Sequence, residues 1–130
     1  MIVLDTSAAI ELLLSLPKAR QVQDCLEKAQ WQVAAPQLII VEVLQVLRRR
    51  VASGITELGD AVVAQELLRD LGTQYFDHEL LGARLWELRD NLTAYDACYV
   101  ALAELLDAEL LTTDARLAAA PGHFARVVLL

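Results

Sequence analysis

Short apolar runs alternate with longer helical segments along this chain, and that alternation is the strongest constraint on its fold. Ile2–Leu4 and Glu109–Thr112 are typical of short strands, because the first is a compact apolar run and the second has two leucines at its centre. Strands separated by helices predict βαβ units, in which a parallel sheet is covered by helices on both faces. We therefore predict a three-layer α/β/α sandwich with a short central parallel sheet, formed by residues 1–130 as a single domain.

The same patterns predict the individual elements. The predicted strands are Ile2–Leu4, Gln32–Ala35, Gln74–Asp77, Glu109–Thr112 and Val127–Leu130. The predicted helices are Ser7–Leu14, Lys18–Lys28, Gln37–Val51, Thr56–Asp70, His78–Arg89, Thr93–Leu106 and Ala115–Ala120.

The composition argues against a membrane or secreted protein. Hydrophobic residues make up 56% of the chain, yet there is no uninterrupted apolar run of about 18 residues. The N-terminus lacks the basic region of a signal peptide. Cys25 and Cys98 lie in helical stretches without a CxxC motif, so we expect free thiols and a cytoplasmic location.

Four carboxylates are candidate functional groups, and three of them follow predicted strands or begin a helix, where a parallel fold brings side chains to one edge of the sheet. Asp5 ends the first strand, Asp114 follows the Glu109–Thr112 strand, and Asp96 lies in the first turn of a helix. Glu42 lies within a helix that is apolar on nearly every side. Because ligands bind at the carboxyl ends of parallel strands, these side chains are candidates for one site.

A structural role is an equally good explanation for each aspartate alone. Asp5 and Asp114 could each cap the helix that follows, and Asp96 could form a capping box with Thr93. Together, however, four carboxylates repel one another unless a cation neutralises them. Ligand sets made only of oxygen select Mg²⁺ or Mn²⁺, so the pattern favours metal-assisted phosphodiester hydrolysis.

The segments that contain these acids resemble PIN-domain proteins, and more narrowly the VapC-type toxins of type II toxin–antitoxin systems. They are IVLDTSA, the VEV around Glu42, and TAYDACYVALAELLDAELLTTD. The resemblance implies an endoribonuclease that depends on Mg²⁺ or Mn²⁺ and is inhibited by a VapB-type antitoxin. It also implies metal binding by Asp5, Glu42, Asp96 and Asp114, with supporting hydroxyls from Thr6, Ser7 and Thr113.

The net charge of −7 is unusual for a protein that binds RNA, because phosphate contacts generally need basic residues. A bound cation can reverse the sign of the field in an acidic pocket, and an acidic surface suits a basic partner. Arg89, Asn91 and Arg116 are candidate substrate contacts, whereas Arg48–Arg50 is typical of a solvated helix end.

The Gln37–Val51 helix is apolar almost all round, which predicts cover on more than one side. A homodimer or an antitoxin helix would provide that cover, and deep burial within the chain would explain the pattern equally well. Other functions also stay open: a non-catalytic PIN-like protein-binding domain, and an RNA-processing nuclease without an antitoxin. Receiver domains and haloacid-type phosphatases fit poorly, because the paired acids, late lysine and D-x-D motif that they need are missing.

Overall fold

The centre of the structure is an all-parallel sheet of five strands. The computed structural model describes all 130 residues. The strands are β1 (Ile2–Leu4), β2 (Val33–Pro36), β3 (Gln74–Phe76), β4 (Glu109–Thr112) and β5 (Arg126–Leu129). They lie in the order β3-β2-β1-β4-β5, and every neighbouring pair is parallel. This confirms the parallel sheet expected from the sequence.

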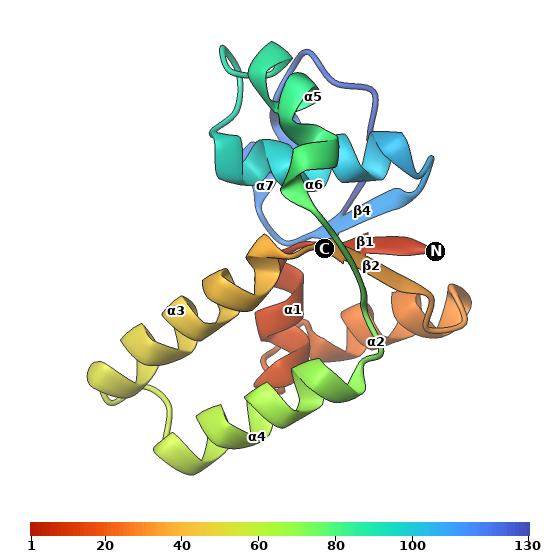
Figure 1. The fold of residues 1–130 in the computed structure, drawn as a ribbon. Helices are drawn as coiled ribbons and strands as arrows, with labels where there is room; N and C mark the ends of the chain where they lie inside the picture. The colour runs from red at the N-terminus through yellow and green to blue at the C-terminus, as the bar shows by residue number, and fades with distance from the viewer.

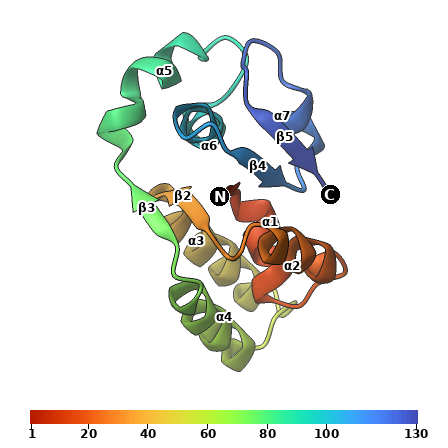
Figure 2. The ribbon, with the colours of Figure 1, turned by 90° about the vertical axis from the view of Figure 1, so that its right-hand side faces the viewer.

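Helices cover both faces of the sheet and complete the predicted three layers (Figures 1 and 2). One layer contains α1 (Thr6–Leu13), α2 (Ala19–Lys28), α3 (Leu38–Ala52) and α4 (Leu58–Asp70). The opposite layer contains the 3₁₀ helix η1 (His78–Leu81), α5 (Gly82–Glu87) and α6 (Ala94–Leu105), and the short α7 (Ala115–Ala119) connects β4 to β5.

The strand order reverses at β1. From β1 the chain builds outward through β2 to β3, then returns to place β4 and β5 on the other side of β1. The end of β1 is held to β4 by the Asp5 N–H, which donates to the Leu111 carbonyl at 3.1 Å. Such a reversal opens a crevice at the carboxyl ends of the strands, which is where parallel α/β folds bind ligands.

The core extends over both faces of the sheet, and α6 is its most continuously buried helix. Seven consecutive residues of α6, from Ala97 to Ala103, are buried. Three of them are alanines, whose small side chains let the helix backbone approach the sheet closely. In the sheet, Leu4 and Leu110 point to opposite faces, and both are fully buried because helices cover each face. Each leucine buried in this way stabilises the fold by about 1.5–3 kcal/mol relative to an exposed one.

One helix differs from the sequence-based expectation. The predicted His78–Arg89 helix is split into η1 and the shorter α5. His78 is half-buried, and its Nε2 accepts the Leu38 N–H at the start of α3. This capping bond fixes the chain at His78 and favours the tight turn there over a continuous α-helix.

The structure also excludes deep burial within the chain as the explanation for the apolar α3, because this helix is covered on one side only. Its buried residues are Ile39, Val43 and Leu47, a single stripe at helical spacing.

Both cysteines are free, as expected. No helix in the structure combines the length and apolar character that crossing a membrane requires.

Leu102→Ala is expected to lower the free energy of unfolding by about 2–5 kcal/mol, because it leaves a cavity in place of a fully buried side chain of α6. Leu105→Ala is the matched control, since this leucine lies on the same helix and is 57% exposed. Urea denaturation of both variants measures the difference. Equal losses would contradict the assignment of this face of α6 to the core.

Candidate active site

A cavity of about 570 Å³ lies at the carboxyl ends of β1 and β4, beside α1, α3 and the start of α6. All four predicted acids line it, although they come from four separate parts of the chain. The remaining lining residues are Thr6, Ser7, Ile10, Leu38, Val41, Gln45, Val46, Arg49 and Tyr95. The fold therefore gathers the acids at one opening.

Asp5 is the most enclosed of the four acids, at 6% exposure. Its Oδ2 accepts hydrogen bonds from the Ser7 hydroxyl at 2.6 Å and the Thr112 hydroxyl at 2.8 Å. The Ser7 N–H also approaches this oxygen at 3.4 Å, so Asp5 caps α1 as well. All three donors use Oδ2, which leaves Oδ1 free for another partner.

Backbone groups set the direction of these hydroxyl bonds. The Thr113 N–H donates to the Ser7 oxygen at 2.9 Å, and the Asp114 N–H donates to the Thr112 oxygen at 3.0 Å. Each hydroxyl thus accepts from the backbone and donates its own proton to Asp5. Hydrogen bonds in such a chain polarise one another, which strengthens the hold on the carboxylate.

Glu42 projects from α3 and is held in a similar way. Its Oε2 accepts from the Thr6 hydroxyl at 2.5 Å and from the Tyr99 hydroxyl at 2.6 Å. The sequence placed Glu42 among apolar neighbours, and these contacts show how its charge is accommodated. Burial raises the pKa of Tyr99 and the Glu42 contact raises it further, so Tyr99 remains a protonated donor.

Asp96 and Asp114 combine a structural contact with a place in the cavity. Asp114 caps α7 by accepting the Arg116 N–H at 2.8 Å. The expected capping box at α6 is half made: the Thr93 hydroxyl accepts the Asp96 N–H, and no backbone N–H donates to the Asp96 carboxylate. Burial raises the pKa of Asp96, and the negative charges of Asp5, Asp114 and Glu42 add to the rise, against an opposing effect of the Thr93 hydroxyl.

The site matches the donor chemistry of a hard divalent cation. Its ligand candidates are all oxygen, and Asp5 and Glu42 each keep one oxygen outside the hydrogen bonds that hold them. No three acidic, histidine or cysteine side chains are gathered tightly enough to form a ready-made cage. The four acids therefore line the cavity as separate groups, and mutual repulsion of their charges favours that spacing.

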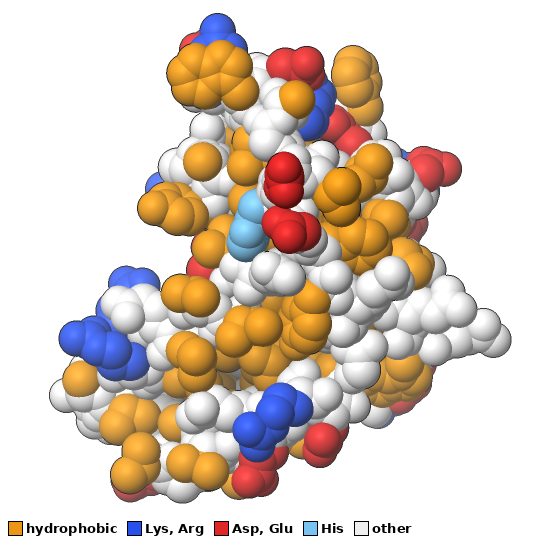
Figure 3. Space-filling model, viewed as in Figure 1, with side chains coloured by type: hydrophobic (Ala, Val, Ile, Leu, Met, Phe, Trp, Pro, Cys, Tyr) orange, Lys and Arg blue, Asp and Glu red, His pale blue; other side chains and the backbone are white.

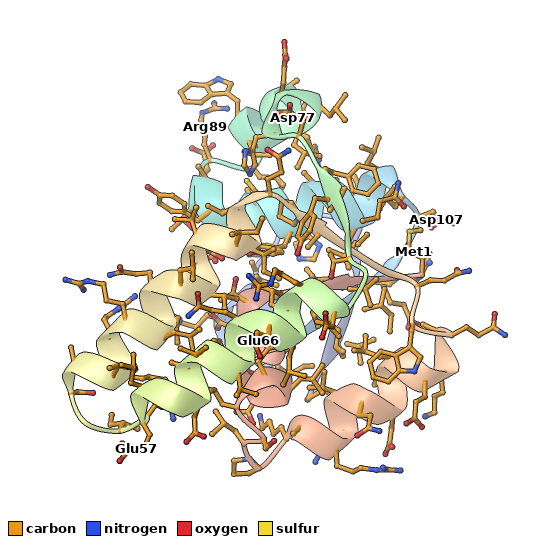
Figure 4. The ribbon with its side chains drawn as sticks, turned by 60° about the horizontal axis from the view of Figure 1, so that its bottom comes forward. Met1, Glu57, Glu66, Asp77, Arg89 and Asp107 are labelled. Carbon is orange, nitrogen blue, oxygen red and sulfur yellow. The ribbon has the colours of Figure 1, made fainter.

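All three predicted substrate contacts, Arg89, Asn91 and Arg116, lie outside the cavity lining. Arg89 lies over the indole of the exposed Trp86, 4.8 Å from the ring centroid, and Figure 4 places it at the opposite end of the molecule from Glu57. The amide of Asn91 lies against Gly122. Arg116 is almost fully exposed, with its Nε 3.9 Å from Asp114 Oδ1.

Thr113 contributes to the site through its backbone rather than its hydroxyl. Its N–H donates to Ser7, whereas the hydroxyl that reaches Asp5 belongs to Thr112. Consecutive residues of a strand point to opposite faces, so the pair of threonines in LLTTD left two choices. Thr6 and Ser7, the other predicted hydroxyls, each donate to an acid of the site.

Sequence reasoning also missed Tyr99 and Arg49. Tyr99 follows Asp96 by three residues, which places both on one face of a helix and was an available signal. Arg49, counted with the solvated end of α3, is the only basic residue that lines the cavity. It lies two helical turns beyond Val41, which lines the cavity too.

Comparisons of this chain with family models and with known proteins agree on one family. The PIN domain family model matches residues 2–122. Ribonuclease VapC9 of Mycobacterium tuberculosis is 39% identical over 117 residues, which cover 90% of this chain and 88% of the relative.

Two solved structures share the fold. VapC20 of Mycobacterium tuberculosis, a sarcin–ricin loop cleaving toxin, superposes with a TM-score of 0.71 at 16% identity, over 92% of this chain and 94% of its own. VapBC2 from Rickettsia felis, bound to a DNA fragment from its promoter, gives 0.66 at 15% identity and covers 98% of both chains.

Asp96→Asn is expected to stabilise the metal-free protein at about pH 7. The folded protein keeps the Asp96 proton to a higher pH than the unfolded chain does, so stability falls as the pH rises from the ordinary value of 3.8 through the raised pKa. The asparagine variant avoids that loss. Urea denaturation in EDTA should show a higher midpoint for the variant near neutral pH, and the difference should shrink on acidification.

Asp90→Asn is the control for this measurement, because the Asp90 side chain is 80% exposed. It should leave the midpoint unchanged at both ends of the pH range. If Asp96→Asn behaved in the same way as this control, the pKa of Asp96 would not be raised in the folded protein.

Proposed function

This chain belongs to the PIN domain family, and from that premise we propose that it is a divalent-metal-dependent endoribonuclease, the toxin of a toxin–antitoxin pair. The observation that carries the proposal is the gathering of Asp5, Glu42, Asp96 and Asp114 around one cavity. Curated relatives named as ribonucleases support RNA as the substrate class.

The four carboxylates are the proposed ligands of Mg²⁺ or Mn²⁺. A cation bound there would supply an activated water and neutralise charge during in-line displacement at a phosphodiester. Asp5 and Glu42 present one oxygen each from positions fixed by hydroxyls. Asp96 and Asp114 complete the acidic lining from the first turn of α6 and the N-cap of α7.

The non-acidic lining fits a nucleotide chain. Arg49 is placed to pair with a phosphate at the end of the cavity formed by α3. Tyr95 is 63% exposed beside Asp96, where its ring offers a surface on which an unpaired base can stack. These two residues replace Arg89, Asn91 and Arg116 as the proposed substrate contacts.

A VapB-type antitoxin is the proposed protein partner, and it would bind the apolar face of α3 and α4. Figure 3 shows hydrophobic side chains spread over this part of the surface. We define the face by its exposed apolar residues: Ile40, Val41, Leu44, Leu58 and Val62. Val41 also lines the acidic cavity, so a chain bound along the face would reach the carboxylates and block the site.

We expect a homodimer and a cytoplasmic location, where RNA and the antitoxin are made. Light scattering on the purified chain tests the dimer. If Val62→Glu made the chain monomeric without weakening antitoxin binding, the apolar face would be a dimer interface instead.

Asp5→Asn and Asp96→Asn are each expected to reduce RNA cleavage to the background seen without enzyme, because each removes a charged ligand candidate. Wild-type cleavage should stop in EDTA and return with excess Mg²⁺ or Mn²⁺. Asp24→Asn is the control and should retain activity, since Asp24 pairs with Arg20 on the surface of α2. Circular dichroism confirms that all variants fold. Full activity of either site variant would show that the proposed site is wrong.

Val62→Glu is expected to prevent co-purification with the antitoxin, because it places a charge on the apolar face of α4. The measurement is co-expression with the product of the neighbouring gene, followed by affinity purification. Leu105→Glu is the matched control, on an exposed leucine of α6 away from the face. A stoichiometric complex with the Val62 variant would exclude this face as the binding surface.

A further inference from the structure

We propose that Tyr99 is a positioning residue, which acts with Thr6 to fix one oxygen of Glu42 so that only the other is available to a divalent cation. The inference rests on the proposed function and assigns Tyr99 a role within it.

The geometry consists of three oxygen atoms from three different helices. Tyr99 Oη, at the end of a side chain that is 1% exposed, donates to Glu42 Oε2 at 2.6 Å. Thr6 Oγ1 donates to the same oxygen at 2.5 Å, and the two hydroxyl oxygens lie 2.7 Å apart. Helices α1, α3 and α6 therefore meet at a single carboxylate oxygen.

A count of protons shows that Glu42 organises this contact. The two hydroxyls carry one proton each, and both protons are used in the bonds to Oε2. None is left for the approach of Tyr99 to Thr6, so the two hydroxyls are held together by the acceptor that they share. A buried tyrosine needs only one acceptor of any kind, whereas this one shares the specific oxygen that Thr6 also holds.

The consequence for the site is a restricted ligand. A glutamate has three rotatable side-chain bonds, and an unrestrained one loses conformational entropy when it binds a cation. The contacts to Thr6 and Tyr99 remove much of that freedom in advance. Because Oε2 already accepts two bonds, Glu42 offers Oε1 alone and binds as a one-oxygen ligand or through a water.

The test is Mn²⁺ binding to the full chain by titration calorimetry without RNA, together with the Mg²⁺ concentration that half-saturates RNA cleavage. Tyr99→Phe removes only the hydroxyl. It is expected to weaken Mn²⁺ binding, and to raise the half-saturating Mg²⁺ concentration, by about 10- to 100-fold each. Thr6→Val should also weaken metal binding, and Thr6→Ser, which keeps a hydroxyl, should lose less affinity for the metal than Thr6→Val does. Tyr75→Phe is the control, because Tyr75 lies on β3 outside the cavity lining.

A purely structural role predicts a different result. It would lower the urea midpoint of Tyr99→Phe and leave the Mn²⁺ affinity of the folded protein unchanged, which would overturn the inference. If Tyr99→Phe failed to fold, the Thr6→Val and Thr6→Ser pair would decide in the same way. Absence of RNA cleavage by the wild-type chain would instead count against the proposed function, and weaker Mn²⁺ binding by the variants would still support the role of Tyr99.

Discussion

Two backbone N–H groups at the end of β4 determine how Asp5 is held, and the arrangement of the site depends on them. They donate to Ser7 and Thr112, whose hydroxyls must then donate to Asp5 Oδ2. This chain of bonds exists only because β4 lies directly beside β1. The strand order that defines the fold therefore also orients the most buried carboxylate, so fold and site arise from the same pairing.

Three of the four acids were predictable because their positions follow from the boundaries of helices and strands, and Glu42 because it is a charge within an apolar helix. Asp5 and Asp114 come directly after strand segments, and Asp96 begins a strongly helical one. Thr112, Tyr99 and Arg49 were not predicted, since their roles depend on which way a side chain points and on contacts between distant elements. The Tyr99 hydroxyl reaches a residue 57 positions away, a distance that no local pattern describes.

Helix α3 connects the two halves of the proposed function. One stripe of it packs in the core, Glu42 and Arg49 face the acidic cavity, and other apolar side chains remain exposed. An almost entirely apolar helix can meet these three demands, which explains why its sequence gave an ambiguous prediction of burial. Inhibition by a partner then needs no long-range conformational change, because the exposed face and the cavity share Val41.

The hydroxyls around Asp5 have a consequence for an asparagine at this position. An amide has one oxygen and one NH₂ group, and the protons of Ser7 and Thr112 require the oxygen. The NH₂ group is then forced to turn toward the cavity, where it can donate to the neighbouring carboxylates. An exchange of nearly identical shape thus reverses the polarity of the group offered to the site, and the amide itself partly substitutes for the missing positive charge.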